Sequence, residues 1–333
     1  MHATAVEGQL EERVVPVETL ATCDLCSGGD FEPRRVWRDE LLFGPERWTL
    51  VRCKACNLYF INPRPTREVI GSFYPTDYAA HLAPPTQPKR WHRRVAAKDA
   101  APISWWEKPI LQVRQDLSWY RIPRWHGDGH VLDIGCGSGG RYLDVLKALG
   151  WTTYGIEPSP QAVANAVAHG HQAVVGTAED APFPDQSMDI VTMWHVLEHT
   201  HSPATALANC FRMLRPGGQL SLCVPNWAGM QAKLYGRFWW SCDAPRHLFQ
   251  FTRKTLGRYL EQAGFRVVKV TTRTGPTSWQ RAARHFLNNV FGTKWARDSS
   301  LLVDVMSPFC ALGSLIRYAG AGAELRVIAE RPS

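Results

Sequence analysis

The sequence predicts an α/β protein built on one twisted parallel sheet, with a small cysteine-rich module in front of it. Two observations lead to this prediction. Between residues 130 and 224, short apolar runs alternate with segments of helical periodicity, which is typical of a parallel sheet covered by helices on both faces. Before them stand two Cys-x-x-Cys pairs separated by 26 residues, and paired cysteines of this kind are typical of a structural metal site.

Composition and charge limit the classes of protein to be considered. The chain has 333 residues, of which 45% are hydrophobic, and a net charge of +8. This charge indicates an anionic partner, such as a nucleic acid, an acidic membrane face or a phosphorylated substrate, or simply a solvated basic surface. The sequence has no run of 18 apolar residues, so no transmembrane segment is predicted. Residues 1–20 lack the layout of a signal peptide. With nine cysteines and no export signal, we expect reduced thiols and a cytoplasmic protein.

Residues 1–78 are predicted to form a zinc-ribbon-like module. Its four thiolates suit one tetrahedral Zn²⁺, and they come from Cys23, Cys26, Cys53 and Cys56. Phe43-Gly-Pro45 supplies a turn between two strand-like runs, so a β-hairpin can fill the long spacing. A four-cysteine site has no open position for a substrate, so we expect it to fold the module or to dock a partner. Four unrelated thiols, or one redox pair, are the alternatives.

Residues 79–104 are predicted to be a proline-rich basic linker. The segment Lys89-Arg-Trp-His-Arg-Arg94 can contact a phosphate backbone or anionic lipid, but a flexible, solvated linker is the preferred interpretation. The main domain follows over residues 105–333, and a helical pattern over 110–120 is expected to cap it.

The main domain is expected to alternate strands and helices. Strands are predicted at residues 131–134, 152–157, 171–176, 188–193, 219–224, 265–272 and 324–330. Ser159, Ser202 and Thr252 are expected to begin helices as N-cap residues. The first strand runs into a glycine turn over residues 135–140, where backbone N–H groups at the start of a helix can approach a nucleotide-like group. Ligands of parallel sheets lie beyond the carboxyl ends of the strands, which is where Gly135, Glu157, Ala178 and His195 are expected.

Residues 130–226 resemble a class I S-adenosylmethionine-dependent methyltransferase. The resemblance rests on Asp133-x-Gly-x-Gly-x-Gly139, on Glu157 at the end of the second strand, on the loop over residues 178–185, and on the turn over 214–218. It implies a Rossmann-like seven-stranded sheet, parallel except for an antiparallel last strand, with S-adenosylmethionine as methyl donor. The residues expected to hold this cofactor are Asp133, Gly135, Cys136, Gly137, Gly139, Glu157, Pro158, Ala178, Glu179, Trp194 and His195. Relatives often carry Asp where Thr177 stands, which leaves the adenine contact open.

Three histidines are candidates for the catalytic base. In the family, the segment after strand four faces the methionine part of the cofactor, and there His195 and His199 are four residues apart, on one face of a helical turn. One alternative is that Glu198 and His199 shape the pocket floor, and another is a metal site at His199 and His201. His247 is the first choice for an acceptor-side base.

His247 belongs to an aromatic lid predicted over residues 225–252. Arg246 beside it is expected to meet an anionic or hydroxylated acceptor. The surrounding sequence, Pro245-Arg-His-Leu-Phe, resembles a stretch of methyltransferases encoded among polysaccharide and secondary-metabolite genes. An apolar insertion over residues 276–320 is expected to be a core helix or a dimer contact, with a membrane interface or an acceptor site around Phe309 as the alternative.

The predicted activity is methyl transfer from S-adenosylmethionine to a small molecule. The acceptor is expected to be a hydroxyl, or an activated carbon, of a saccharide, a lipid-linked glycan or another secondary metabolite, and it can be anionic. A peripheral membrane contact and a homodimer are open. One alternative is an RNA base methyltransferase that docks RNA through the zinc module, although the basic residues gather in one linker. The other is a non-catalytic scaffold that binds S-adenosylmethionine.

Overall fold

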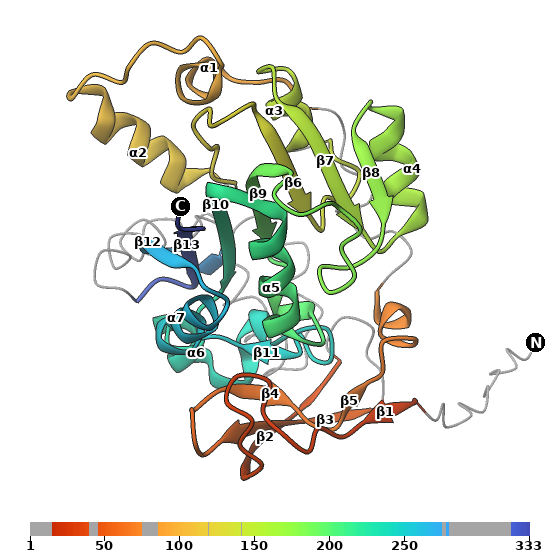
Figure 1. Cartoon of the computed structure of the whole chain (residues 1–333). Helices are drawn as coiled ribbons and strands as arrows, with labels where there is room; N and C mark the ends of the chain where they lie inside the picture. The colour runs from red at the N-terminus through yellow and green to blue at the C-terminus, as the bar shows by residue number, and fades with distance from the viewer. Residues whose placement is uncertain are drawn as a thin grey trace, which may run out of the picture.

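The computed structural model describes residues 15–39, 46–74, 86–118, 120–140, 142–274, 278–279 and 321–333. Its centre is a seven-stranded sheet with the strand order β12-β13-β10-β9-β6-β7-β8 (Figure 1). The strands are β6 (His130–Ile134), β7 (Thr152–Glu157), β8 (Gln172–Val175), β9 (Met188–Trp194), β10 (Leu214–Pro225), β12 (Arg266–Arg273) and β13 (Glu324–Glu330). All seven predicted strands are present, which confirms the predicted α/β fold.

The direction of the strands also agrees with the prediction. β6 pairs in parallel with β7 and β9, β7 with β8, and β9 with β10. β13 lies between β10 and β12 and is antiparallel to both. β10 begins earlier than expected, at Leu214, and its register with β9 shifts between Leu214 and Gln219. The predicted turn over residues 215–218 is therefore an irregular start of this strand.

Helices cover both faces of the sheet. They are α1 (Arg90–Ala96), α2 (Glu107–Leu117), α3 (Leu143–Lys147), α4 (Pro160–Ala168), α5 (Pro203–Met213), α6 (Met230–Tyr235) and α7 (Arg253–Gln262). Ser159, Ser202 and Thr252 each accept a hydrogen bond from the backbone N–H three residues later, which confirms the predicted N-caps. Val131 packs in the cluster that contains α3, whereas Leu132 packs in the cluster that contains α5 and α7. Successive side chains of a strand point to opposite faces of the sheet, so these two neighbours lie in different core layers.

The N-terminal module is joined to the main domain by a shared sheet. Its elements are β1 (Val17–Glu18), β2 (Phe31–Arg38), β3 (Arg47–Cys53), β4 (Tyr59–Ile61), β5 (Arg64–Pro65) and the 3-10 helix η1 (Ile70–Phe73). β2 and β3 form the predicted hairpin, whose turn over residues 43–45 lies outside the described residues. The sheet order is β11-β4-β3-β2, and β11 (Phe249–Gln250) comes from the main domain.

Two expectations about the connecting segments are corrected. Residues 90–96 of the predicted linker form α1, in which Val95 and Ala96 are buried and the Ala96 carbonyl accepts a hydrogen bond from Trp151 Nε1 at 2.9 Å. A solvated linker is wrong for this helix because its apolar side packs on the sheet layer. The aromatic segment 225–252 lies between the module and the sheet, with Trp239, Phe249 and Phe251 buried, so it is an internal layer and not an exposed lid.

Two short turns belong to that segment and a third follows β9, and one further expectation cannot be compared. The 3-10 turns are η2 (Leu197–His199), η3 (Gly236–Phe238) and η4 (Trp240–Cys242). The insertion over residues 276–320, with Phe309, lies outside the described residues apart from 278 and 279. Within the described ranges, no helix has the length and apolar character needed to cross a membrane.

Candidate functional site

The glycine turn after β6 has a backbone that other residues do not readily adopt. Gly135, Gly137 and Gly139 have φ angles of +72°, +54° and +74°. A Cβ at Gly135 would lie 2.4 Å from Val196 Cγ2, and one at Gly139 would lie 2.6 Å from the His171 ring. The turn is therefore closed by neighbouring side chains on both sides. Its N–H groups bond within the chain: Gly135 donates to the Ile156 carbonyl at 2.8 Å and Gly139 to the Cys136 carbonyl at 3.0 Å.

Glu157 joins the second strand to this turn. Its carboxylate is buried and accepts the Gly137 N–H at 3.0 Å and the Ser159 N–H at 3.1 Å. Asp133 is also buried, and Thr192 donates a hydrogen bond to it at 2.6 Å. Burial, together with the nearby charge of Glu157, raises the pKa of Asp133 to about 7. The structure thus brings together the predicted cofactor residues of the first two strands.

The loop over residues 177–180, which is predicted to contact the adenine, uses its polar side chains for contacts within the chain. Ala178 is buried in the core, but Glu179 uses one carboxylate oxygen to accept the N–H groups of His201 at 2.7 Å and Ser202 at 3.3 Å. Thr177 donates its hydroxyl to Asp180 at 3.0 Å. The Glu179 carboxylate therefore supports the start of α5, and its predicted contact with the cofactor stays a prediction, as do those of exposed Pro158 and half-buried Cys136.

His195 lies at the end of β9 in a charged cluster. Its φ angle of +57° is unusual for a residue with a side chain, and its N–H donates to the Cys223 carbonyl at 2.9 Å. Its Nδ1 lies 3.1 Å from Glu198 and its Nε2 lies 3.9 Å from Glu324. Burial alone would lower the pKa of His195, but the contacts with Cys223 and Glu198 raise it well above its ordinary value. Neighbouring groups therefore contact both ring nitrogens of His195, Glu198 at Nδ1 and Cys223 at Nε2, the latter at 3.6 Å.

Glu324 and Arg273 complete this cluster and are absent from the sequence-based site. Arg273 Nη1 contacts both Glu324 oxygens, at 3.0 and 3.3 Å. Both residues lie at the site edge because β13 is antiparallel to β10 and β12, so its first residue, Glu324, pairs with the last residues of these two strands, Pro225 and Arg273. The sequence predicted an antiparallel last strand, but this prediction places Glu324 near His195 only when the strand order is known.

His199 and His247 form the second cluster, with ring centroids 4.6 Å apart. His199 Nδ1 lies 3.0 Å from the Arg246 carbonyl, which can only accept, so this nitrogen carries the proton and Nε2 is left as the acceptor. His247 Nδ1 donates in the same way to the Ser241 carbonyl at 2.8 Å, and its Nε2 lies 3.8 Å from Asp243. Burial, together with the charge of His247, lowers the pKa of His199 to about 4. Two imidazoles are thus oriented with basic nitrogens available.

The N-terminal module contributes directly to this second cluster. Tyr74, which follows η1, places its hydroxyl 2.9 Å from His199 Nδ1. The neighbouring Phe73 carbonyl accepts a hydrogen bond from Arg246 at 2.8 Å. Tyr74 was not among the predicted site residues, since nothing in the local sequence links it to a histidine 125 positions away.

Arg246 does not have the predicted role. Its side chain is only 1% exposed, and it contacts Asp39 at 2.8 and 3.0 Å and Asp243 at 3.1 Å. The expectation that Arg246 meets the acceptor is wrong, because its guanidinium is enclosed between the module and the segment before β11. Nor does His201 join His199 in a metal site, since its Nε2 contacts the Pro65 carbonyl at 3.1 Å.

The four cysteines of the module converge as predicted. Their Sγ atoms all lie within 4.8 Å of one another, with 3.6 Å between Cys23 and Cys56 and 3.5 Å between Cys26 and Cys53. Zn–S bonds of about 2.3 Å in a tetrahedron require S···S separations of about 3.8 Å. The cluster therefore fits one Zn²⁺ with no position left for a substrate.

Both cysteine pairs are built as the same turn. Ser27 and Asn57, which follow the second cysteine of each pair, have φ angles of +58° and +63°. Their N–H groups return to the carbonyls of Cys23 and Cys53 at 2.8 and 2.9 Å. This repetition explains how two short segments far apart in the chain present four sulfurs to one centre.

Comparison with known proteins places the main domain in a known group. A family model described as "Methyltransferase domain" matches residues 82–270. Ubiquinone biosynthesis O-methyltransferases of Pseudomonas fluorescens and Pseudomonas aeruginosa are each 30% identical, over 149 and 151 residues respectively. Each match covers 40% of this chain and 63% of the relative, so the chain spans less than two thirds of the length of these relatives. A crystal structure of an S-adenosylmethionine-dependent methyltransferase from Mesorhizobium loti is 17% identical, with a TM-score of 0.44, and covers 68% of this chain and 97% of its own.

Proposed function

The chain belongs to the methyltransferase-domain family, and from this premise we propose that it transfers the methyl group of S-adenosylmethionine to a hydroxyl of a small molecule. One observation carries the proposal: the positive-φ glycine turn lies directly against the buried Glu157 carboxylate. In this arrangement Glu157 binds the ribose hydroxyls and the turn lines the amino-acid end of the cofactor. When bound, the sulfonium supplies an electrophilic methyl group.

The histidine pair supports a hydroxyl as the acceptor. A hydroxyl must lose its proton as its oxygen is methylated, and a positioned imidazole is the usual group for this at neutral pH. His247 is the better base, because Ser241 orients its ring and the Asp243 carboxylate stabilises the cation that forms. The names of the O-methyltransferase relatives support the same choice of acceptor atom. A saccharide, a lipid-linked glycan or another secondary metabolite is the proposed class.

Zn²⁺ in the four-cysteine cluster is proposed as a structural ion. The closed sulfur geometry supports this assignment, since a catalytic zinc needs an open position. Asp24, between the first two cysteines, contacts Ser202 at 2.7 Å and Tyr259 at 3.0 Å in the main domain. The ion therefore holds a module whose other residues, Tyr74 among them, form a wall of the methyl-transfer site.

Glu157→Ala is expected to raise the Kd for S-adenosylmethionine by roughly 10- to 100-fold, because hydrogen bonds to a charged group contribute about 1.5–3 kcal/mol. Isothermal calorimetry measures this directly. Glu261→Ala, which removes an exposed carboxylate from α7, is the matched control and should bind as the wild type does. Equal affinities for all three proteins would contradict the proposed cofactor site.

His247→Asn is expected to lower kcat by roughly 10²- to 10⁴-fold, the usual contribution of a general base. His199→Asn should not change how kcat depends on pH above pH 5. The pKa of His199 is about 4, so this side chain is already neutral in that range. The measurement is transfer of radiolabelled methyl groups to a panel of hydroxylated small molecules. Labelling only of RNA, lost on nuclease treatment, would replace the small-molecule acceptor by a nucleic acid.

A further inference from the structure

Helix α2 presents an apolar face that no described part of the chain covers. Trp106, Ile110 and Val113 are 57%, 52% and 42% exposed, and their spacing of four and three residues places them on one side of the helix. Trp105, just before them, is 81% exposed. Leu111 and Gln115 on the opposite side are buried. Adjacent exposed aromatic and aliphatic side chains are rare on a surface without a partner.

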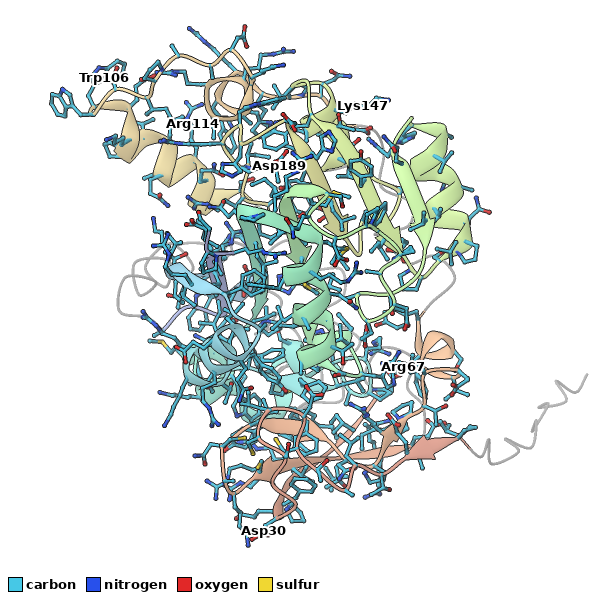
Figure 2. All side chains as sticks on the ribbon, viewed as in Figure 1. Asp30, Arg67, Trp106, Arg114, Lys147 and Asp189 are labelled. Atoms are coloured by element: carbon cyan, nitrogen blue, oxygen red, sulfur yellow. The ribbon has the colours of Figure 1, made fainter. Side chains whose placement is uncertain are left out.

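This face lies at the end of the molecule opposite the N-terminal module. Figure 1 shows α1 and α2 at the upper end and β2 to β5 at the lower end. Figure 2 shows Trp106 projecting outward at the start of α2. The methyl-transfer site is built where η2 meets Tyr74 and β11, on the side of the module. A surface that bound α2 would therefore leave that site accessible.

The surroundings of this face are positively charged. Over residues 86–115, six exposed cations accompany a single exposed carboxylate, Asp99, and Glu107 is paired with Arg94. The exposed cations are Lys89, Arg90, Arg93, Lys98, Lys108 and Arg114. A second copy of the same face would be repelled by this charge, whereas an anionic surface would be attracted to it.

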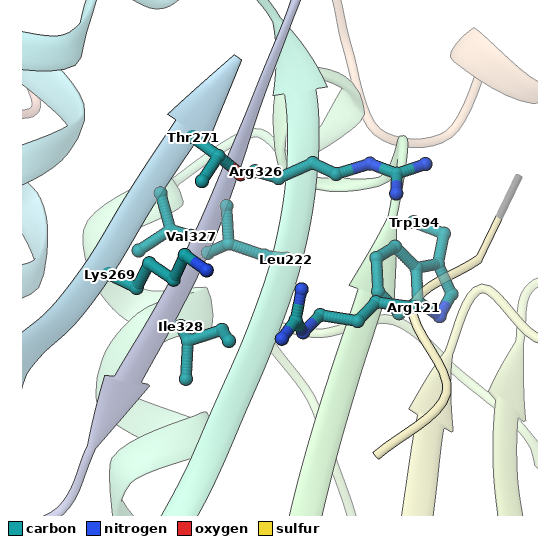
Figure 3. Close-up of a pocket in the computed structure, with 8 residues that line it drawn as sticks. All are labelled: Arg121, Trp194, Leu222, Lys269, Thr271, Arg326, Val327 and Ile328. Atoms are coloured by element: carbon teal, nitrogen blue, oxygen red, sulfur yellow. The ribbon is translucent and has the colours of Figure 1, made fainter. Parts of the chain in front are cut away.

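A cleft of about 520 Å³ adjoins the inner side of α2. It lies between α2, residues 121–126 and the sheet, where Ile190 of β9 and Gln219 of β10 line it. Its described lining includes Lys108, Arg124 and His126 but no carboxylate. Arg121 also lines it and reaches a neighbouring small pocket with Lys269 and Arg326, which Figure 3 shows against the strands. The positive charge thus continues from the exposed face into a space large enough for a lipid head group.

From this combination of exposed indole rings and cations, we propose that α1 and α2 dock the protein on the surface of an anionic lipid bilayer. Trp105, Trp106 and Ile110 lie at the level of the head groups, where tryptophan is enriched in membrane-bound proteins. The surrounding cations contact lipid phosphates, and each basic residue near such a surface strengthens binding about fivefold. A nucleic acid would account for the cations but would leave the aliphatic residues Ile110 and Val113 unexplained.

The test is co-sedimentation of the full chain with vesicles of phosphatidylcholine and phosphatidylglycerol (3:1) and with vesicles of phosphatidylcholine alone. We expect at least tenfold stronger binding to the anionic vesicles, and weaker binding at 500 mM salt. Trp105→Ser/Trp106→Ser and Lys108→Glu/Arg114→Glu should each lower binding by about tenfold or more. Val167→Ser, which removes a 51% exposed apolar residue from α4, is the matched control and should bind as the wild type does.

Each variant should keep the wild-type affinity for S-adenosylmethionine, which shows that it is folded and that the methyl-transfer site is unaffected. Wild-type protein that stays in the supernatant with anionic vesicles would overturn the proposal. So would α2 variants that sediment like the wild type. A dimer in light scattering that Trp105→Ser/Trp106→Ser dissociates, without vesicle binding, would assign this face to a second copy instead.

Discussion

Replacing Cys53 with serine is expected to remove zinc from the four-cysteine cluster and to unfold the N-terminal module. Structural zinc sites of this kind contribute about 10–16 kcal/mol of apparent binding free energy, which in a small module is also folding free energy. The four sulfurs join the turn before β2 to the turn after β3, and β1, β4 and β5 are only two or three residues long, so the module depends on this centre. The measurement is the zinc content of the purified protein together with its near-UV circular dichroism.

The same variant is expected to lose methyl transfer while keeping most of its affinity for S-adenosylmethionine. The glycine turn and Glu157 belong to the main domain, whereas Tyr74 and Asp39 belong to the module and hold His199 and Arg246. Cys242→Ser is the control, because this buried thiol lies outside the four-cysteine cluster and donates to the Gly236 carbonyl at 3.7 Å. Wild-type protein without one equivalent of zinc would contradict the assignment, and so would a Cys53→Ser protein with full activity.

Asp39→Ala is expected to lower the free energy of unfolding by about 3–5 kcal/mol, the usual effect of removing one partner of a buried ion pair. Both side chains of the Asp39–Arg246 pair are only 1% exposed, so water cannot replace the lost carboxylate. Arg246 keeps Asp243 and the Phe73 carbonyl, which favours the lower end of this range. Urea unfolding measures the change.

Two further variants make this prediction specific. Asp30→Ala removes the carboxylate of an exposed pair with Lys54 and should change the free energy of unfolding by less than about 1 kcal/mol. The double variant Asp39→Ala/Arg246→Met should recover part of the loss, because it no longer leaves a buried charge without its partner. A loss below 1 kcal/mol for Asp39→Ala would show that this pair does not stabilise the contact between module and main domain.

Much of the main domain could be predicted from the sequence because its signals are local. The run from Asp133 to Gly139 is the end of a strand and the turn that leads to α3 at Leu143, and Glu157 follows in the next strand. The apolar periodicity of each segment reflects which face is buried, so strands and helix caps can be predicted one unit at a time. Each cysteine pair is equally local, and the presence of two Cys-x-x-Cys pairs was enough to predict one shared metal site.

The remaining features depend on contacts between distant segments, which local patterns do not encode. Arg246 was expected at the acceptor, but Asp39, 207 residues away, encloses it. The predicted linker contains a helix because the sheet offers Val95 and Ala96 a face on which to pack. Glu324 meets His195 only through the strand order β13-β10-β9.

The sequence by itself therefore determined the α/β sheet, the glycine turn with Glu157 and the four-cysteine cluster, since each follows from residue types within one or two neighbouring elements. The tertiary structure alone decided that Tyr74 of the module contacts His199 of the proposed methyl-transfer site and that the described residues leave an apolar, basic face of α2 exposed. Both depend on which surfaces remain after the chain has packed. Burial of a side chain is a property of its neighbours in space, and for Arg246, Tyr74 and Trp106 those neighbours are set by the whole fold.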